Sequence, residues 1–220
     1  MTFPHEPWTS WQPADTLLIP VGSVEQHGPH LAFTTDTDIA QVVCADAAAQ
    51  RHVDVAPPLH FSSSGEHQGF RGVLSLGAEV TEAAIGELIR SARLTWRHVI
   101  IVCGHGGNHR AVMSALRTCE AEGASVAAWF TTEPDGDLHA GATATSIVAT
   151  WDPDVLEREL IDVPIPANWL DIWMNEGLPA LSPTGVLGEP SRATIDHGHG
   201  TRARWCAEVV SLIDEREGRS

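Results

Sequence analysis

Residues His98 to His109 read HVIIVCGHGGNH, an apolar run that breaks into glycines, histidines and an asparagine. The apolar run of residues 98–103 predicts a buried strand, and the residues that follow predict a helix from about 109 to 122. Between them, glycines at 104, 106 and 107 surround His105. Glycine permits unusual φ values and close backbone approach, so this loop would let a histidine reach inward while the next backbone amides face a substrate oxygen. The stretch therefore predicts a strand, a functional loop and a helix in succession.

Two other interpretations of the loop are weaker. A plain turn does not need a histidine between glycines. A phosphate-binding loop is excluded because neither G-x-x-x-x-G-K-[ST] nor G-x-G-x-x-G fits, and the chain contains no lysine.

The same alternation of strand and helix extends along the chain in both directions. Strands are predicted at residues 16–22, 53–61, 98–103 and 125–130, and helices at about 38–50, 81–96, 109–122 and 201–217. This order is typical of a mainly parallel sheet with helices on both faces. The prediction is an α/β three-layer sandwich that forms one domain over residues 1–220. Residues 153–192, rich in proline and tryptophan, look like an insertion that shapes a pocket or covers the surface.

Composition excludes several classes of partner. The chain has 220 residues and a formal net charge of -16, from 29 acidic residues against 13 arginines, so nucleic acid and anionic membranes would be repelled. No apolar run approaches the ~20 residues of a membrane span, and residues 1–15 show no leader pattern. We expect a cytoplasmic protein. Four scattered cysteines without a C-x-x-C pair are expected to be buried small hydrophobic residues.

Histidines and carboxylates follow each predicted strand, where ligands of parallel sheets bind. Glu25 and His27 come after the first strand, and Asp36 follows at a helix start. Two carboxylates and an imidazole suit Zn²⁺, Mn²⁺ or Fe²⁺, although E-x-H alone is more typical of a solvated loop. The other strand ends carry three more groups, which are Glu66 with His67, His105 with Gly106, Gly107 and Asn108, and His139. Each alone is usually structural, but four such groups at one sheet edge favour a metal site.

Five motifs in chain order resemble the creatininase family of metal-dependent amidohydrolases, and the likeness covers nearly the whole chain. They read PVGSVEQHGPHLAFTTDTDIA, SSSGEHQGFRGVLSLG, GHGGNH, DLHAGATATS and TGVLGEP. The resemblance implies an α/β sandwich around a two-metal centre and a homo-oligomer of identical subunits. It is strongest toward the branch that acts as the peptidase of mycofactocin biosynthesis, which removes a C-terminal dipeptide from a small precursor peptide.

The resemblance also implies roles for individual residues. Metal ligation falls on Glu25, His27, Asp36 (bridging) and His105. His139 is implied as a catalytic group, and we assign it the proton shuttle to the leaving amine. Its alternative is a supporting structural role. Glu66 and His67 are implied as part of the pocket wall, and Gly106, Gly107 and Asn108 are expected to contact substrate.

One position departs from the family pattern. Relatives usually read H-A-G-x-x-E-T-S, with the glutamate implied as a ligand of the second metal, whereas this chain has Ala144 there. One or two metals per subunit are therefore expected, with the second weakly held. His197 and His199 are conceivable replacements, although a polar loop before the last helix is the simpler interpretation of those residues.

Three other functions stay open. A creatinine hydrolase is disfavoured because that subgroup carries an acidic residue where this chain has Gly107. A formamide hydrolase acting on a nucleotide-like substrate is disfavoured by the scarcity of basic loop residues. A noncatalytic binding or scaffold protein is motivated by Ala144, and metal content would separate it from the enzymes.

Overall fold

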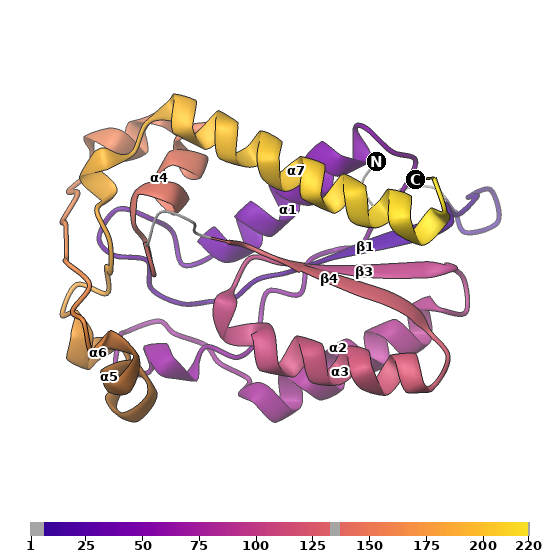
Figure 1. Cartoon of the computed structure of the whole chain (residues 1–220), viewed down its shortest axis with the longest axis horizontal. Coiled ribbons are helices and arrows are strands. Elements are labelled where there is room, and N and C mark those ends of the chain that lie inside the picture. The colour runs from indigo at the N-terminus through magenta and orange to yellow at the C-terminus, as the bar shows by residue number, and fades with distance from the viewer. Residues whose placement is uncertain (1–6, 133–136, 220) are drawn as a thin grey trace.

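A parallel four-stranded sheet lies at the centre of the molecule (Figure 1). The computed structural model describes residues 7–132 and 137–219. Residues 1–6, which belong to the segment without a leader pattern, and residues 133–136 before His139 lie outside the described chain. The strands are β1 (Thr16–Val21), β2 (Asp54–Val55), β3 (His98–Cys103) and β4 (Ser125–Phe130), in the order β2-β1-β3-β4. All six residues of β1 and of β3 are buried, as expected for strands that are covered on both faces.

Helices cover both faces of this sheet. On one face lie α1 (Thr35–Ala48), α4 (Ala142–Ala149) and α7 (Ile195–Glu217), and on the other lie α2 (Ala78–Ala92) and α3 (His109–Ala121) (Figure 1). The short helices α5 (Trp169–Glu176) and α6 (Leu178–Leu181) lie apart from these layers, at one end of the molecule. The predicted α/β three-layer sandwich is confirmed. No helix within the described residues combines the length and apolarity needed to cross a bilayer.

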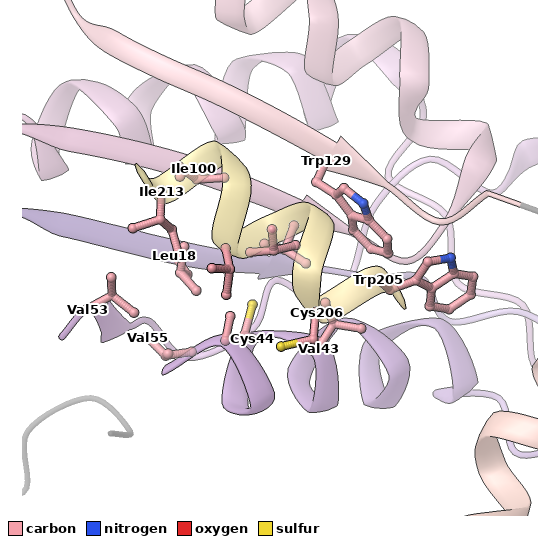
Figure 2. Packing of buried hydrophobic residues seen from close by; sticks show 14 of the residues in the cluster. Leu18, Val43, Cys44, Val53, Val55, Ile100, Trp129, Trp205, Cys206 and Ile213 are labelled. Atoms are coloured by element: carbon pink, nitrogen blue, oxygen red, sulfur yellow. The ribbon is translucent and has the colours of Figure 1, made fainter. Parts of the chain in front are cut away.

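Alternate residues of each strand supply two separate cores. Ile100 and Val102 of β3 pack toward α1 and α7, whereas Ile101 and Cys103 pack toward α2 and α3. Figure 2 shows the first core, with Trp129 and Trp205 together at one end of the cluster. Their ring centroids lie 5.4 Å apart with the rings edge to face. All four cysteines are buried and free, so the prediction of a hydrophobic role for them is confirmed.

Strand β2 is much shorter than the predicted strand 53–61. Pro57 and Pro58 interrupt it, because proline has no backbone N–H to donate to the neighbouring strand. Pairing with β1 resumes at Leu59, whose N–H donates to the Pro20 carbonyl at 2.9 Å. The chain therefore continues along β1 without forming a regular strand.

Helix α7 begins at Ile195, six residues earlier than predicted from the sequence, so the expected loop before it at residues 197–200 is wrong. Thr194 caps the helix, since its side chain accepts a hydrogen bond from the His197 N–H at 3.1 Å. Read alone, residues 196–200, DHGHG, suggest a polar loop. Gly198 is instead needed where α7 meets α4, because a Cβ atom there would overlap the carbonyl oxygen of Ser146.

This contact predicts opposite effects of two neighbouring substitutions. Gly198→Ala should lower the free energy of unfolding by about 1–3 kcal/mol, because it overpacks the junction of α7 and α4. Gly200→Ala, with no atom near the added Cβ, should raise it by about 1 kcal/mol through helix propensity alone. Urea denaturation of both variants measures the difference. Equal effects would show that the packing contact is unimportant.

Candidate metal centre

Six ionisable side chains from different segments meet at the carboxyl edge of the sheet. Glu25 and His27 follow β1, and Asp36 stands in the first turn of α1. His67 ends the 3₁₀ turn η1 (Gly65–His67), while His105 and His139 follow β3 and β4. The structure thus brings together all four residues proposed as metal ligands, with His67 and His139 beside them.

The polar atoms of this cluster lie close to one another. His27 Nε2 is 2.9 Å from Asp36 Oδ1, and His105 Nδ1 is 3.1 Å from Asp36 Oδ2. Around Glu25 Oε1 lie three ring nitrogens, His67 Nε2 at 3.2 Å, His105 Nδ1 at 3.3 Å and His139 Nδ1 at 3.7 Å. Asp36 also accepts a 2.7 Å hydrogen bond from the Ser23 hydroxyl, which fixes its carboxylate.

Glu25 gives the strongest indication that the cluster binds a cation. Its side chain is fully buried, and within the described chain no donor makes a well-directed hydrogen bond to either carboxylate oxygen, although three histidine nitrogens lie within 3.7 Å of Oε1. A buried carboxylate without partners is costly unless it neutralises a positive charge. Burial raises the pKa of Glu25, against the opposing effect of His105. The arrangement is typical of a carboxylate that awaits a cation.

Neighbouring charges favour the ionised form of Asp36 and the protonated form of His105. Burial opposes ionisation of Asp36, but His27 and His105 together hold its pKa well below the usual value. Burial likewise opposes the charged form of His105, yet Glu25 and Asp36 raise its pKa well above the usual value. In the chain by itself, protons on these histidines balance the buried carboxylates where a metal ion would do so.

Backbone carbonyls fix the tautomer of three of the histidines. Because a carbonyl only accepts, the ring nitrogen facing it carries the proton. His105 Nε2 donates to the Ser63 carbonyl at 2.8 Å, and His139 Nε2 donates to the Gln26 carbonyl at 2.7 Å. His27 Nδ1 donates to the Glu25 carbonyl at 3.3 Å. The opposite nitrogen of each ring faces the carboxylates, which is the arrangement of metal-ligating histidines.

His67 has the reverse arrangement. The Gln26 amide is oriented because its oxygen accepts from the Gly28 N–H at 2.9 Å and its nitrogen donates to the Gly185 carbonyl at 3.3 Å. That nitrogen also lies 3.3 Å from His67 Nδ1, which therefore accepts. Burial lowers the pKa of His67, so the ring is neutral and its proton sits on Nε2, toward Glu25. His67 presents an N–H to the cluster.

The donor set suits a divalent first-row metal. Two groups of three donors have ligand atoms within 4.8 Å of one another, Glu25 with His27 and Asp36, and Glu25 with His67 and His139. The tautomer of His67 makes the second group the poorer one. Glu25, Asp36 and His105 Nδ1 form a further set, in which His105 Nδ1 lies 3.3 Å from Glu25 Oε1 and 3.1 Å from Asp36 Oδ2. Carboxylates and imidazoles in this ratio fit zinc, manganese or iron.

Glycines allow the segments of the cluster to approach one another. A Cβ atom at Gly104 would overlap the backbone oxygen of Asp36, and one at Gly107 would overlap Glu66 Oε1 and His105 Nε2. The expected unusual φ values are wrong for this loop, because Gly104, Gly106 and Gly107 are absent from the positive-φ glycines. Close approach explains Gly104 and Gly107, whereas a Cβ atom at Gly106 would meet no atom within 4 Å.

A cavity of about 310 Å³ opens onto the cluster. Its wall includes Glu66, His67, Gly106 and Gly107, all expected to contact substrate, together with the insertion residues Trp169 and Trp173. The prediction that the insertion shapes a pocket is therefore confirmed. Ala144 also lines this cavity, so the family glutamate would face it from α4.

Three residues considered from the sequence lie elsewhere. Asn108 is not part of the wall; its buried amide donates to the Gly22 carbonyl and the Ser62 hydroxyl, both at 3.0 Å, and accepts from the Ser63 N–H. It joins the segments that follow β1 and β2. His197 and His199 stand in the first turns of α7 and line no part of the cavity, so they do not replace the missing glutamate.

Sequence reasoning missed several supporting side chains. Gln26 orients His67, as described above. His30 is buried and donates from Nε2 to the Thr145 hydroxyl at 2.9 Å, beside Ala144. Asp137 accepts from the Thr143 N–H at 3.2 Å at the start of α4 and lines the cavity. The motif HGPH contained a signal for His30, whereas the partners of Gln26 are distant in sequence.

Comparison with known proteins places the chain in a family. The creatininase profile, described as creatinine amidohydrolase, matches residues 8–213. The chain is 40% identical to the mycofactocin precursor peptide peptidase of Mycolicibacterium smegmatis, over 91% of this chain and 83% of that protein. It is 37% identical to the protein of the same name from Mycobacterium ulcerans, over 90% and 84%. The creatinine amidohydrolase of Pseudomonas putida is 26% identical, over 83% and 82%.

Solved structures agree with this assignment at the level of the fold. A mutant creatininase complexed with creatine superposes with a TM-score of 0.78 at 24% identity, covering 91% of both chains. A creatininase described as the Mn form gives 0.77 at 23% identity, covering 91% of this chain and 90% of the other, and another is described as Zn-Zn type. The profile match and the peptidase relatives show the family, whereas the solved structures support the fold alone. The chain belongs to the creatininase family and is an enzyme of the hydrolase class.

Proposed function

We propose that this protein is a metal-dependent peptidase that hydrolyses an amide bond near the C-terminus of a small precursor peptide, as in mycofactocin biosynthesis. The observation that carries the proposal is the fully buried Glu25 carboxylate, which the ring nitrogens of His67, His105 and His139 approach within 3.7 Å. These histidines and Asp36 line the cavity. The relatives at 37% and 40% identity support the peptide substrate. We further propose a cytoplasmic homo-oligomer with one domain per subunit.

In this proposal Glu25, Asp36 and His105 hold one cation, and His27 with Asp36 begins a second site. Bound divalent metals activate water as a nucleophile and polarise an amide carbonyl. Asp36 orients His27 and His105 through its two oxygens, which lie 2.9 and 3.1 Å from their rings. Glu66 contacts the ring nitrogen of His105 that faces away from Asp36, with Oε1 3.3 Å from Nε2. The Nε2–H of His67 is directed toward Glu25 Oε1, at an N–O distance of 3.2 Å.

His139 is positioned to transfer a proton from the attacking water to the leaving amine. Burial, reinforced by the charge of His27, lowers the pKa of His139 to about 3, so its ring is neutral at physiological pH. Its Nε2 is occupied by the Gln26 carbonyl, which leaves Nδ1 as the reactive atom. A neutral Nδ1 first accepts a proton from the attacking water and then delivers it to the leaving amine.

The proposal is tested by metal analysis and mass spectrometry of peptide products. Purified protein should contain zinc, manganese or iron and should shorten a mycofactocin precursor peptide by two residues from its C-terminus. Chelation should abolish cleavage, and the same metal should restore it. A protein that binds no metal and leaves the peptide intact would favour a noncatalytic role.

Ala144 gives a prediction about the number of metals. The parent should bind about one metal per subunit tightly and a second weakly, because the carboxylate expected at this position is missing. Ala144→Glu returns an oxygen donor to the cavity wall and should produce two tight metals and faster peptide hydrolysis. Calorimetric metal titration and peptide assays on both proteins measure this.

The control for Ala144→Glu is Ala144→Gln, which has almost the same size without the charge. It should leave the metal count of the parent unchanged. A parent that already holds two tight metals at full activity would contradict the weak-site interpretation and show that another residue completes the set.

Creatinine hydrolysis is the second candidate, but the wall at Gly107 disfavours it. The acidic residue of that subgroup cannot be placed here while Glu66 keeps its position, because even a Cβ atom would overlap Glu66 Oε1. Incubation with creatinine should therefore give no detectable creatine under conditions that cleave the peptide.

A further inference from the structure

A second, outer hollow of about 640 Å³ adjoins the cavity above the cluster. The two share the wall residues Glu66, Gly107 and Trp173. Glu66 marks the junction, since its Oε1 contacts the back of His105 while its side chain also lines the outer hollow. A peptide bound at the cluster therefore has a path outward between the 3₁₀ turn η1, the start of α3, and α5.

The carboxylates that line this path are joined by a positively charged side chain, that of Arg110. The inner cavity is lined by the carboxylates of Asp36, Glu66 and Asp137, in a chain with net charge -16. Arg110, in the first turn of α3, is the one arginine that the described structure places in the wall of either hollow, and the chain has no lysine. Its side chain is exposed and has no hydrogen bond or ion pair within residues 7–132 and 137–219. This guanidinium is free to bind a ligand.

We propose that Arg110 binds the C-terminal carboxylate of the peptide, so that the outer hollow receives the two residues that hydrolysis releases. This inference rests on the proposed function. Two extended residues span about 7 Å, so the carboxylate of the released dipeptide lies well away from the cleaved bond. A guanidinium binds a carboxylate with two parallel hydrogen bonds, and it would offset the repulsion from Glu66 and the neighbouring Glu176.

The remaining wall suits the released residues, and another arginine does not compete. Trp173 and Met174 offer apolar surface for side chains, and Met174 is 75% exposed. Arg71 lines a third hollow, but that hollow shares no wall residue with the inner cavity or the outer one. Arg110 is therefore placed to make the enzyme specific for peptides that end two residues beyond the cleaved bond.

The test compares free acids with C-terminal amides. The probes are an N-acetylated peptide ending in Leu-Phe, for hydrolysis by the metal-loaded enzyme, and the dipeptide Leu-Phe, for calorimetric binding. The parent should favour each acid over its amide by roughly 10- to 100-fold, as expected for a charged hydrogen bond. Arg110→Gln should remove that preference through a higher KM and weaker dipeptide binding, with amide hydrolysis within about twofold of the parent. Arg110→Lys should recover part of the preference.

Arg117→Gln is the matched control, because Arg117 is exposed on the same helix and lines neither hollow. It should behave as the parent. Equal binding of acid and amide by the parent, or an equal loss on both substrates in Arg110→Gln, would overturn the inference while leaving peptidase activity intact. If the parent binds the acid selectively but cleaves neither peptide nor a mycofactocin precursor, the proposed function fails and the carboxylate site stands.

Discussion

Asp36→Ala is expected to remove bound metal and abolish peptide hydrolysis, the largest effect of any single substitution in this chain. Asp36 is the only carboxylate of the described cluster whose two oxygens each face a different histidine, His27 and His105. Its loss removes a ligand from both proposed sites and leaves those imidazoles without their acceptor. Metal affinity should fall by more than the roughly 10- to 100-fold that loss of a mere supporting group costs.

Elemental analysis and metal titration measure this effect without relying on activity. Asp36→Asn keeps the size of the side chain and should also lose metal while folding normally, as judged by circular dichroism. Asp38→Ala is the matched control, since Asp38 lies in the same turn of α1 and its carboxylate accepts from the Thr34 hydroxyl at 2.8 Å, away from the cluster. If Asp36→Asn binds metal as the parent does, the assignment of the site is wrong.

The layers of the fold could be predicted because the strands are continuous apolar runs. Strands β3 and β4 have the bounds expected from the sequence, since their burial on both faces leaves no polar interruption except at the ends. The start of α7 could not be predicted in the same way. Gly198 and Gly200 suggest a loop when read locally, and only the contact of Gly198 with α4 explains a glycine inside the helix.

The candidate site could likewise be predicted from the sequence only in part. Parallel strands bring their carboxyl ends to one edge, so residues after β1, β3 and β4 could be expected to meet there. Hydrogen-bond roles could not be read from the sequence, because they depend on tertiary partners. His67 differs from the other cluster histidines only through Gln26, 41 residues earlier in the chain. Arg110 likewise has no local signal, and its place in the outer wall follows from the packing of α5.

His139→Gln is expected to retain metal and yet lower the rate of peptide hydrolysis by roughly 10²- to 10⁴-fold, the contribution typical of a general acid–base group. The His139 Nδ1 atom lies 3.7 Å from Glu25 Oε1, the longest approach among the histidine nitrogens around that oxygen. The distance alone does not separate proton transfer from ligation, because His139 also belongs to a group of donors that could hold a metal. Glutamine keeps a hydrogen-bond donor for the Gln26 carbonyl but cannot carry a proton between water and amine.

Single-turnover kinetics and metal analysis on the same preparation separate the two roles of His139. His199→Gln is the control, because His199 is exposed on α7 and should give parental rates. Loss of metal together with activity in His139→Gln would make His139 a ligand and favour the group it forms with Glu25 and His67. Retained metal with unchanged turnover would instead leave His139 a structural residue.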